Sequence, residues 1–188
     1  GKSYHISKVA QYLKKKNKPF IQIREPGGSV NSEKIRKLIL NNKSTFNKYT
    51  DLLLYLSARS ENLELIKKNI GKKIILIDRF SDSTIAYQHY GMKVNFKFIK
   101  FINEFLLKGI KINFTFLNIV NKKNMKKRLT KRKNLNRYDK FDYNFYDKVQ
   151  KGFIKILKKK PKKYMLINSN LNIRYNVKTI LDKIDNLI

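Results

Sequence analysis

The sequence predicts a three-layer α/β domain built on a mostly parallel β-sheet. Short aliphatic runs alternate with segments whose apolar residues recur every three or four positions, which is the order of strand–helix–strand units. One run, residues 74–77, has four consecutive aliphatic side chains, as is typical of a strand buried on both faces of a parallel sheet. The 188 residues have the length of one domain and show no internal repeat or domain boundary.

Each predicted strand is a short apolar run that ends in turn-forming or charged residues. Helical segments separate successive runs, so the strands pair in parallel through right-handed crossovers. The predicted strands are residues 20–23, 74–77, 112–117 and 164–167.

The helical segments are bounded by ordinary start and stop signals. Asn31 is a candidate N-cap, Pro19 follows the end of the first helix, and Gly71 is a candidate C-cap after a last turn rich in lysine. The predicted helices are residues 6–13, 31–40, 51–69, 81–90, 96–107, 122–132, 141–158 and 173–187, with a charge-dense loop at 133–140.

The formal net charge of +31 has two interpretations. Lys and Arg could neutralise the phosphates of a nucleic acid. The excess is nearly all Lys, however, and it is spread along a chain also rich in Ile and Asn, which favours a coding sequence rich in A and T. We prefer this compositional explanation, although a basic surface still attracts anionic substrates.

The composition also bounds the compartment. The chain has no cysteine, which excludes disulfides and cysteine metal sites and fits a reducing compartment. It has no apolar run of about 18 residues, so we expect no transmembrane helix and no membrane partner, and no signal peptide is visible.

The first three residues match the end of a phosphate-binding loop. Gly1, Lys2 and Ser3 fit the last positions of G-x-x-x-x-G-K-[ST], and an amphipathic helix follows as that motif requires. In such a loop the Lys reaches the β- and γ-phosphates and the hydroxyl binds Mg²⁺. Three residues alone also fit an exposed chain start with no such role.

Charged residues follow two of the predicted strands. The loop at residues 24–28 reads REPGG, and its two glycines allow close approach of the backbone to a ligand. Asp78 and Arg79 follow the aliphatic run, at the strand end where open α/β sheets bind ligands. The acid could hold Mg²⁺ and the base could grip a phosphate bidentately. The alternatives are an ordinary turn and a surface ion pair.

Polar and aromatic side chains recur on the neighbouring helices. Tyr55 and Arg59 share one helix face, where a ring could stack on a base and a guanidinium could donate to its carbonyl. The alternative is that the Arg59 side chain packs along the ring of Tyr55 in the core, which explains the same spacing without a ligand. Side chains that end in a polar group also recur on the helix after the Asp-Arg pair, at Ser83, Thr84, Tyr87 and Gln88.

Three arginines lie in or beside the charge-dense loop. A mobile cationic flap over a phosphate chain would use such residues, although each taken singly is an ordinary solvated side chain. They are Arg128, Arg132 and Arg137.

Taken together and in order, these blocks resemble bacterial thymidylate kinase (dTMP kinase). The blocks are REPGGS, EKIRKLIL, LLLYLSARSENL, IDRFSDSTIAYQHYG and NRYDKFDYNFYDKVQKGF, and they cover nearly the whole chain. The resemblance implies a P-loop kinase fold, a single nucleoside monophosphate kinase domain over residues 1–188, and a lid at about 122–142. It also implies transfer of the γ-phosphoryl group of ATP to dTMP with Mg²⁺, in dTTP synthesis in the cytoplasm.

The resemblance also implies a role for each matching residue. Catalysis would involve Lys2, Asp78 and Arg79, with Mg²⁺ held at Ser3 and Asp78. ATP and its phosphates would be bound by Gly1, Lys2, Ser3, Arg128, Arg132 and Arg137. The dTMP side would comprise Glu25, Pro26, Arg36 at the phosphate, Tyr55 stacked on thymine, Arg59 at its carbonyl, Arg79, Tyr87 near the sugar, and Ser83, Thr84 and Gln88 at the thymine edge.

Several departures from the family pattern qualify this expectation. The family begins with a central strand and a full glycine-rich loop, so we expect a fragment that keeps four of five strands. Tyr4 stands where a small residue is usual, Asn136 replaces an Asp, and Asp139 stands near a usual Glu. The alternatives are a catalytically inactive kinase fragment and a basic nucleic-acid-binding module. ATP and dTMP are the expected partners, with no nucleic acid, and the complete protein is expected to be a homodimer.

Overall fold

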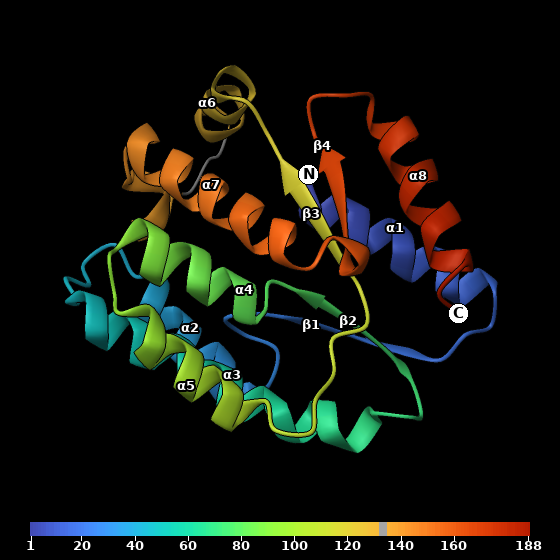
Figure 1. Cartoon of the computed structure of the whole chain (residues 1–188), viewed down its shortest axis with the longest axis horizontal. Coiled ribbons are helices and arrows are strands. Elements are labelled where there is room, and N and C mark those ends of the chain that lie inside the picture. The colour runs from blue at the N-terminus through green and yellow to red at the C-terminus, as the bar shows by residue number, and fades with distance from the viewer. Residues whose placement is uncertain (132–134) are drawn as a thin grey trace.

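The computed structural model describes residues 1–131 and 135–188 (Figure 1). In chain order the elements are α1 (Lys2–Lys15), β1 (Phe20–Arg24), α2 (Val30–Leu40), α3 (Lys48–Asn69), β2 (Ile74–Asp78), α4 (Ser81–Thr84), the π-helix η1 (Ile85–Gly91), α5 (Phe96–Leu106), β3 (Thr115–Ile119), α6 (Lys122–Thr130), the 3₁₀-helix η2 (Arg137–Lys140), α7 (Tyr143–Lys159), the 3₁₀-helix η3 (Pro161–Lys163), β4 (Tyr164–Asn168) and α8 (Ile173–Asp185).

The strands pair in parallel, which confirms the predicted α/β class. β1 pairs with β2 from Phe20↔Ile74 to Arg24↔Asp78, and β3 pairs with β4 along their whole lengths. The strands that the structure describes form two separate two-stranded sheets and not one continuous four-stranded sheet. Apolar side chains from both pairs pack instead in one core cluster with α1 and α8, which joins the two sheets.

Helices cover both faces of the β1–β2 pair, and this gives the predicted three layers. Ile74 and Leu76 pack toward α1 and α8, whereas Ile75 and Ile77 pack toward α3. Alternate side chains of a strand point to opposite faces, so the aliphatic run contributes to two cores. Its residues are only partly buried, in contrast to the prediction, because β2 has a hydrogen-bonded strand along one edge only.

Several element boundaries differ from those predicted. Strand β3 is shifted toward the C-terminus, because its pairing with β4 runs from Thr115 to Ile119. The predicted helix at 81–90 is divided into the short α4 and the π-helix η1. The N-cap of α2 is Ser29, whose side chain accepts from the Ser32 N–H, while Asn31 donates to Glu61 on α3.

The charge-dense loop contains a helical turn that the sequence did not predict. The Asn136 side chain accepts from the backbone of η2, and the Asp139 carboxylate accepts from the Asn136 N–H, which together form a capping box. This turn fixes the direction of Arg137 and Tyr138. Residues 132–134, at the end of the predicted basic helix and the start of the loop, lie outside the described residues.

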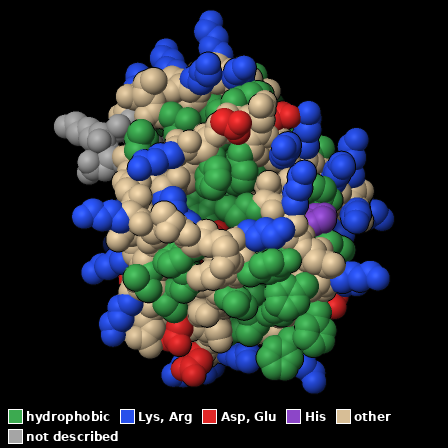
Figure 2. Space-filling model, turned by 90° about the vertical axis from the view of Figure 1, so that its left-hand side faces the viewer, with side chains coloured by type: hydrophobic (Ala, Val, Ile, Leu, Met, Phe, Trp, Pro, Cys, Tyr) green, Lys and Arg blue, Asp and Glu red, His purple; other side chains and the backbone are tan. Residues whose placement is uncertain are grey.

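Lys and Arg side chains are spread over the face shown in Figure 2 and are not gathered in one patch. None of the helices that the structure describes is both long enough and apolar enough to cross a membrane.

Candidate active site

The carboxyl ends of β1 and β2 bring the predicted phosphate-handling residues together. Arg24 and Asp78 are partners in the strand register, so the REPGG loop and the Asp-Arg pair begin side by side. Lys2, at the start of α1, has its Nζ 4.0 Å from Asp78 Oδ1. Arg79 has a φ of 69°, a left-handed backbone conformation that ends the extended strand after Asp78.

Only glycine fits at the two glycine positions of the REPGG loop. Gly27 and Gly28 have φ angles of +114° and +116°, and a Cβ on Gly28 would lie 2.9 Å from Asn62 Oδ1. Asn62 holds the loop, since its Nδ2 donates to the Gly27 carbonyl at 2.8 Å and its Oδ1 accepts from the Ser29 N–H at 3.0 Å. The loop is therefore fixed to α3 before any ligand binds.

A buried ion pair lies behind this loop. Arg59 Nε donates to Glu25 Oε2 at 2.9 Å, and Arg59 Nη1 donates to Asn103 Oδ1 on α5 at 2.8 Å. The side chains of Arg59 and Glu25 are only 2% and 4% exposed. Burial raises the pKa of the Glu25 carboxyl, and the neighbouring Arg59 guanidinium opposes that shift. Arg59 thus joins the loop to α5, and its remaining N–H groups are the ones that a ligand carbonyl could use.

Two more arginines approach the same space from different elements. Arg36 Nη1 on α2 donates to the Pro26 carbonyl at 2.6 Å. Arg79 Nη2 donates to the Tyr87 hydroxyl at 3.1 Å, and its guanidinium lies 4.9 Å from the Tyr87 ring centre. Burial, and then the charges of Arg24 and Arg79, lower the pKa of Arg36. Cations crowded in this way make a site that favours an anion such as a phosphate.

Three tyrosines form an aromatic wall next to these cations. The ring of Tyr138, on η2, lies edge-on to Tyr55 at 5.8 Å and to Tyr87 at 6.0 Å between centroids. Burial raises the pKa of the hydroxyls of both Tyr55 and Tyr138. Tyr55 and Tyr87 were predicted at the thymine and the sugar, and the structure brings them together.

Polar atoms of α4 and η1 complete this side. Thr84 and Gln88 are buried and lie four residues apart, and Ser83 is half-buried beside them. Within the part of the chain that the structure describes, three buried side-chain atoms have no hydrogen-bond partner: Glu25 Oε1, Thr84 Oγ1 and Asn103 Nδ2. Such atoms are rare in folded proteins, and a bound polar molecule would satisfy them.

Four of the predicted ATP-binding residues lie exposed on the surface. Gly1, Lys2 and Ser3 are all exposed, as is Arg128 on α6. Arg128 Nη2 donates to the Ser169 carbonyl at 2.9 Å, and a Cβ on Gly1 would lie 3.5 Å from Arg128 Nη1. The start of α1 and the basic helix α6 therefore meet at the end of β4. Arg132 is outside the described residues.

Arg137, the third predicted flap arginine, points to a different part of the site. Its Nη2 donates to Asp51 on α3, and its Nε donates to the Ile39 carbonyl at 3.1 Å. Arg137 is therefore bound on the side of α2 and α3, and not beside Arg128.

Sequence reasoning missed four side chains that organise the site, namely Asp51, Asn62, Asn103 and Tyr138. For two of them a signal was present. Asp51, Tyr55, Arg59 and Asn62 are spaced i, i+4, i+8 and i+11, so they form one polar stripe along α3. Tyr138 could not be found in this way, because it reaches the site from the segment after α6.

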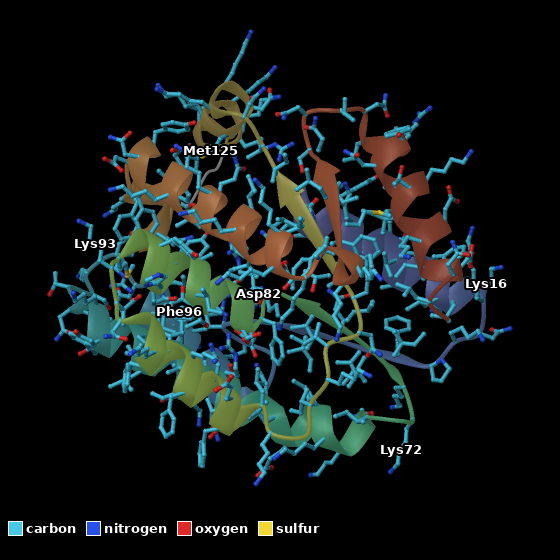
Figure 3. The ribbon with its side chains drawn as sticks, in the orientation of Figure 1. Lys16, Lys72, Asp82, Lys93, Phe96 and Met125 are labelled. Carbon is cyan, nitrogen blue, oxygen red and sulfur yellow. The ribbon has the colours of Figure 1, made fainter. Side chains whose placement is uncertain are left out.

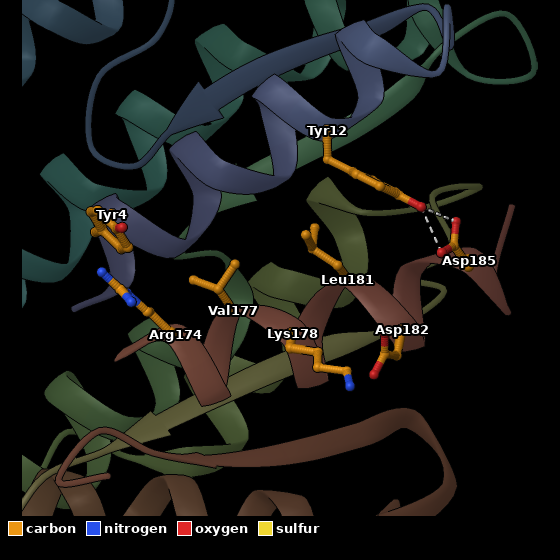
Figure 4. Close-up of a pocket in the computed structure, with 8 residues that line it drawn as sticks. All are labelled: Tyr4, Tyr12, Arg174, Val177, Lys178, Leu181, Asp182 and Asp185. Atoms are coloured by element: carbon orange, nitrogen blue, oxygen red, sulfur yellow. Dashed lines mark hydrogen bonds between the residues drawn. The ribbon is translucent and has the colours of Figure 1, made fainter. Parts of the chain in front are cut away.

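Two other polar features lie outside the proposed substrate contacts. Asp82, labelled in Figure 3, accepts from the Tyr164 hydroxyl at 2.6 Å and so joins α4 to β4. Burial raises the pKa of its carboxyl. A groove of about 370 Å³ lies between α1 and α8, where the Tyr12 hydroxyl donates to the Asp185 carboxylate (Figure 4). Tyr4, the residue that departs from the family pattern, lines this groove.

Parallel strands with a loop lysine, an Asp-Arg pair and converging arginines at their carboxyl ends define a kinase that transfers a phosphoryl group between nucleotides. The family profile for thymidylate kinase matches residues 1–180. The chain belongs to the thymidylate kinase family.

Individual relatives agree with the family match. A thymidylate kinase of Thermosipho africanus is 34% identical over 187 residues, which cover 97% of this chain and 92% of the relative. A thymidylate kinase of Mycoplasma capricolum is 35% identical, with 98% and 91% covered. The crystal structure of thymidylate kinase from Ehrlichia chaffeensis superposes with a TM-score of 0.78 at 26% identity and covers 98% of this chain and 92% of that one. These matches confirm the predicted family and fold.

Proposed function

We propose that the protein phosphorylates dTMP to dTDP with ATP as the donor. The observation that carries this proposal is the convergence of Arg36, Tyr55 and Arg79 beside the rigid REPGG loop in a member of the thymidylate kinase family. Arg36 and Arg79 would hold the dTMP phosphate, and Tyr55 would stack on the base. Arg59 would contact the thymine carbonyl with the N–H groups that Glu25 and Asn103 leave.

Phosphoryl transfer depends on positioning and on neutralisation of charge, and the donor side offers both. Lys2 would contact the β- and γ-phosphates, and Arg128 would bind the polyphosphate from α6. Arg79 would bridge donor and acceptor phosphates, because it lies between Asp78 and the dTMP side. The nucleophile is an oxygen of the dTMP phosphate, so no covalent enzyme intermediate is needed.

The residues present fit a magnesium ion carried by the nucleotide. Mg²⁺ prefers oxygen ligands and is usually bound through one or two carboxylates, water and substrate phosphates. Asp78 and Ser3 would supply the protein oxygens, and no cluster of three acidic, His or Cys side chains occurs among residues 1–131 and 135–188. When bound, the ion neutralises charge on the transferring phosphoryl group.

Two measurements test the proposal separately. Formation of dTDP from dTMP, ATP and Mg²⁺ is followed by chromatography, and dTMP binding without ATP is followed by calorimetry. We expect both to occur, with dTMP preferred over dAMP, dGMP and dCMP. Binding of dTMP without turnover would favour the inactive-kinase alternative, and absence of both would refute the proposal.

The basic nucleic-acid-binding alternative predicts a gathered cationic surface. The face in Figure 2 instead has dispersed Lys and Arg, so nothing on that face favours the alternative. A single-stranded oligonucleotide that bound more tightly than dTMP at physiological salt would reverse this preference.

We also propose that two copies of the chain associate through α5. Phe98, Phe101 and Phe105 lie on its outer face and are 40%, 68% and 73% exposed. Exposed apolar side chains also gather low on the face in Figure 2. A set of large exposed apolar side chains on one helix face marks an interaction site. The net charge of +31 opposes association, so burial of these rings must outweigh the repulsion between the two copies. Light scattering should show a dimer that Phe101→Glu dissociates and that Lys14→Glu, at an exposed lysine of α1, leaves intact. A monomeric unsubstituted chain would refute this.

A further inference from the structure

Asp51 is a buried acid on α3 with a role that the phosphoryl transfer described above does not use. It is 1% exposed, and it lies one helical turn before Tyr55. Its Oδ2 accepts from Gln88 Nε2 at 3.2 Å and from the Tyr138 hydroxyl, and its Oδ1 accepts from Arg137 Nη2. Three elements far apart in the sequence therefore meet at one carboxylate.

The negative charge of the buried Asp51 carboxylate is neutralised by a side chain from the segment after α6. Arg137 supplies the opposite charge, and its Nε also donates to the Ile39 carbonyl at 3.1 Å, near the C-terminus of α2. The Arg137 guanidinium lies 5.4 Å from the Phe46 ring centre, which holds its plane. A buried charge with a bound partner on each oxygen has a fixed position.

This arrangement determines which way round the Gln88 amide lies. An ionised carboxylate has only acceptor atoms, so it can bind the NH₂ end of a glutamine but not the carbonyl end. The Gln88 carbonyl oxygen must then face away from Asp51. Among the described residues, Gln88 Oε1 accepts no hydrogen bond, so it remains available to a ligand donor.

The oriented amide suits one kind of pyrimidine. Thymine has an N–H donor at position 3, whereas cytosine has a lone pair there. A fixed carbonyl oxygen accepts from the first and repels the second. Thr84, one turn earlier on the same face, has a buried hydroxyl oxygen without a protein partner, which is a second polar atom available to the base edge.

We propose that Asp51 is a positioning residue that sets base specificity by holding the Gln88 amide with its carbonyl oxygen toward the base. The inference rests on the proposed function, since it assumes that a pyrimidine nucleotide binds beside Tyr55. Asp51 does not touch the nucleotide and acts only through Gln88, while Arg137 and Tyr138 hold Asp51 in place.

The test compares the dissociation constants of dTMP and dCMP, measured by calorimetry, in the full chain and in Asp51→Asn. A site that hydrogen-bonds a substrate group rejects an analogue lacking it by about 10⁴ or more, so we expect strong preference for dTMP in the unsubstituted protein. Asn can offer either an oxygen or an NH₂ group to Gln88, so both amide orientations become possible. In Asp51→Asn we expect the ratio of the dCMP dissociation constant to the dTMP dissociation constant to fall at least about tenfold.

Two further variants show whether a change in base specificity arises only because the site has become less rigid. Arg137→Lys keeps a cation for Asp51 but loses the planar guanidinium contacts, so dTMP affinity should fall while the ratio stays within about twofold. Tyr138→Phe removes one donor to Asp51 and keeps the ring, and it should also preserve the ratio. Asp185→Asn, which alters a Tyr-bound carboxylate at α1 and α8, should change neither constant.

An unchanged ratio in folded Asp51→Asn would overturn the inference and leave the proposed function intact. An equal fall of the ratio in Arg137→Lys would also overturn it, because loosening alone would then explain the effect. If Asp51→Asn does not fold, Tyr138→Phe serves as the test. A fall of its dCMP-to-dTMP ratio of dissociation constants as large as the fall expected for Asp51→Asn would overturn the inference as well. No binding of dTMP by the unsubstituted chain would refute the proposed function itself.

Discussion

The two halves of the active site are built differently. On the proposed dTMP side, Glu25, Arg59 and Gln88 are nearly inaccessible and are bound to one another or to side chains from other elements. On the proposed ATP side, Lys2 and Arg128 are exposed and lie at helix ends. A base is read by polar atoms at fixed positions, whereas a polyphosphate is bound by cations that can close and open around it. We therefore expect selectivity for the base to depend on buried side chains with fixed positions, and binding of ATP to depend on exposed side chains.

The largest effect is expected at the residue between the two halves. Arg79→Ala removes a guanidinium that would bridge both phosphates, so kcat should fall by about 10³ or more, equivalent to roughly 4 kcal/mol. Steady-state kinetics would measure it. Arg79 also holds the Tyr87 hydroxyl, so Tyr87→Phe is the matched control and should lower kcat far less. Near-normal turnover of Arg79→Ala would exclude it from phosphate handling.

A change on the dTMP side should affect stability and recognition together. Arg59→Ala leaves the buried Glu25 carboxylate without its cation, and breaking such a pair costs about 3–5 kcal/mol of unfolding free energy. The KM for dTMP should rise strongly because the thymine contact and the support of the REPGG loop are both lost. Urea unfolding and kinetics measure the two effects, and an unchanged KM would refute the thymine-reading role.

The equivalent change on the ATP side should separate these effects. Lys2→Ala removes an exposed cation 4.0 Å from Asp78, so the unfolding free energy should stay within about 0.5 kcal/mol. We expect kcat to fall about 10²-fold, since one donor to the developing phosphoryl charge is lost. A loss of stability as large as that of Arg59→Ala would contradict the contrast between the two halves.

The sequence predicted the parts of the site that use local spacing. Tyr55 with Arg59 and Thr84 with Gln88 are four-residue pairs on helices, and the structure places each pair on one face. The REPGG loop was predicted because two glycines after a strand indicate a tight backbone turn, and the positive φ angles at both confirm it.

The rest of the site depends on contacts that no local pattern records. Arg137 was grouped with Arg128 because both are basic and near one loop, but the capping box at Asn136 turns Arg137 toward Asp51, 86 residues away in the sequence. Asn103 supports Arg59 from a helix predicted only for its apolar face. Likewise, the division into two strand pairs depends on which strand edges meet, and this cannot be read from the aliphatic runs themselves.

The smallest expected effect concerns a histidine on the ATP side. His5 lies buried on α1 with Nδ1 2.8 Å from Asn118 Oδ1 on β3. Burial lowers its pKa below the usual 6.5, while the bond to Asn118 opposes the shift. Between the folded pKa and 6.5 the unfolded chain binds more protons, so stability rises with pH across that window and is lost as the pH falls through it.

Urea unfolding from pH 5 to 8 checks this, with a slope of at most about 1.4 kcal/mol per pH unit from this one group. His5→Gln should remove that slope. Asn118→Asp places an anion beside the ring, which raises the folded pKa of His5 and should reverse the slope, so that stability falls as the pH rises. If His5→Gln keeps the full slope, His5 does not titrate as a buried group. The ATP side would then be more open at α1 than the buried contact between His5 and Asn118 indicates.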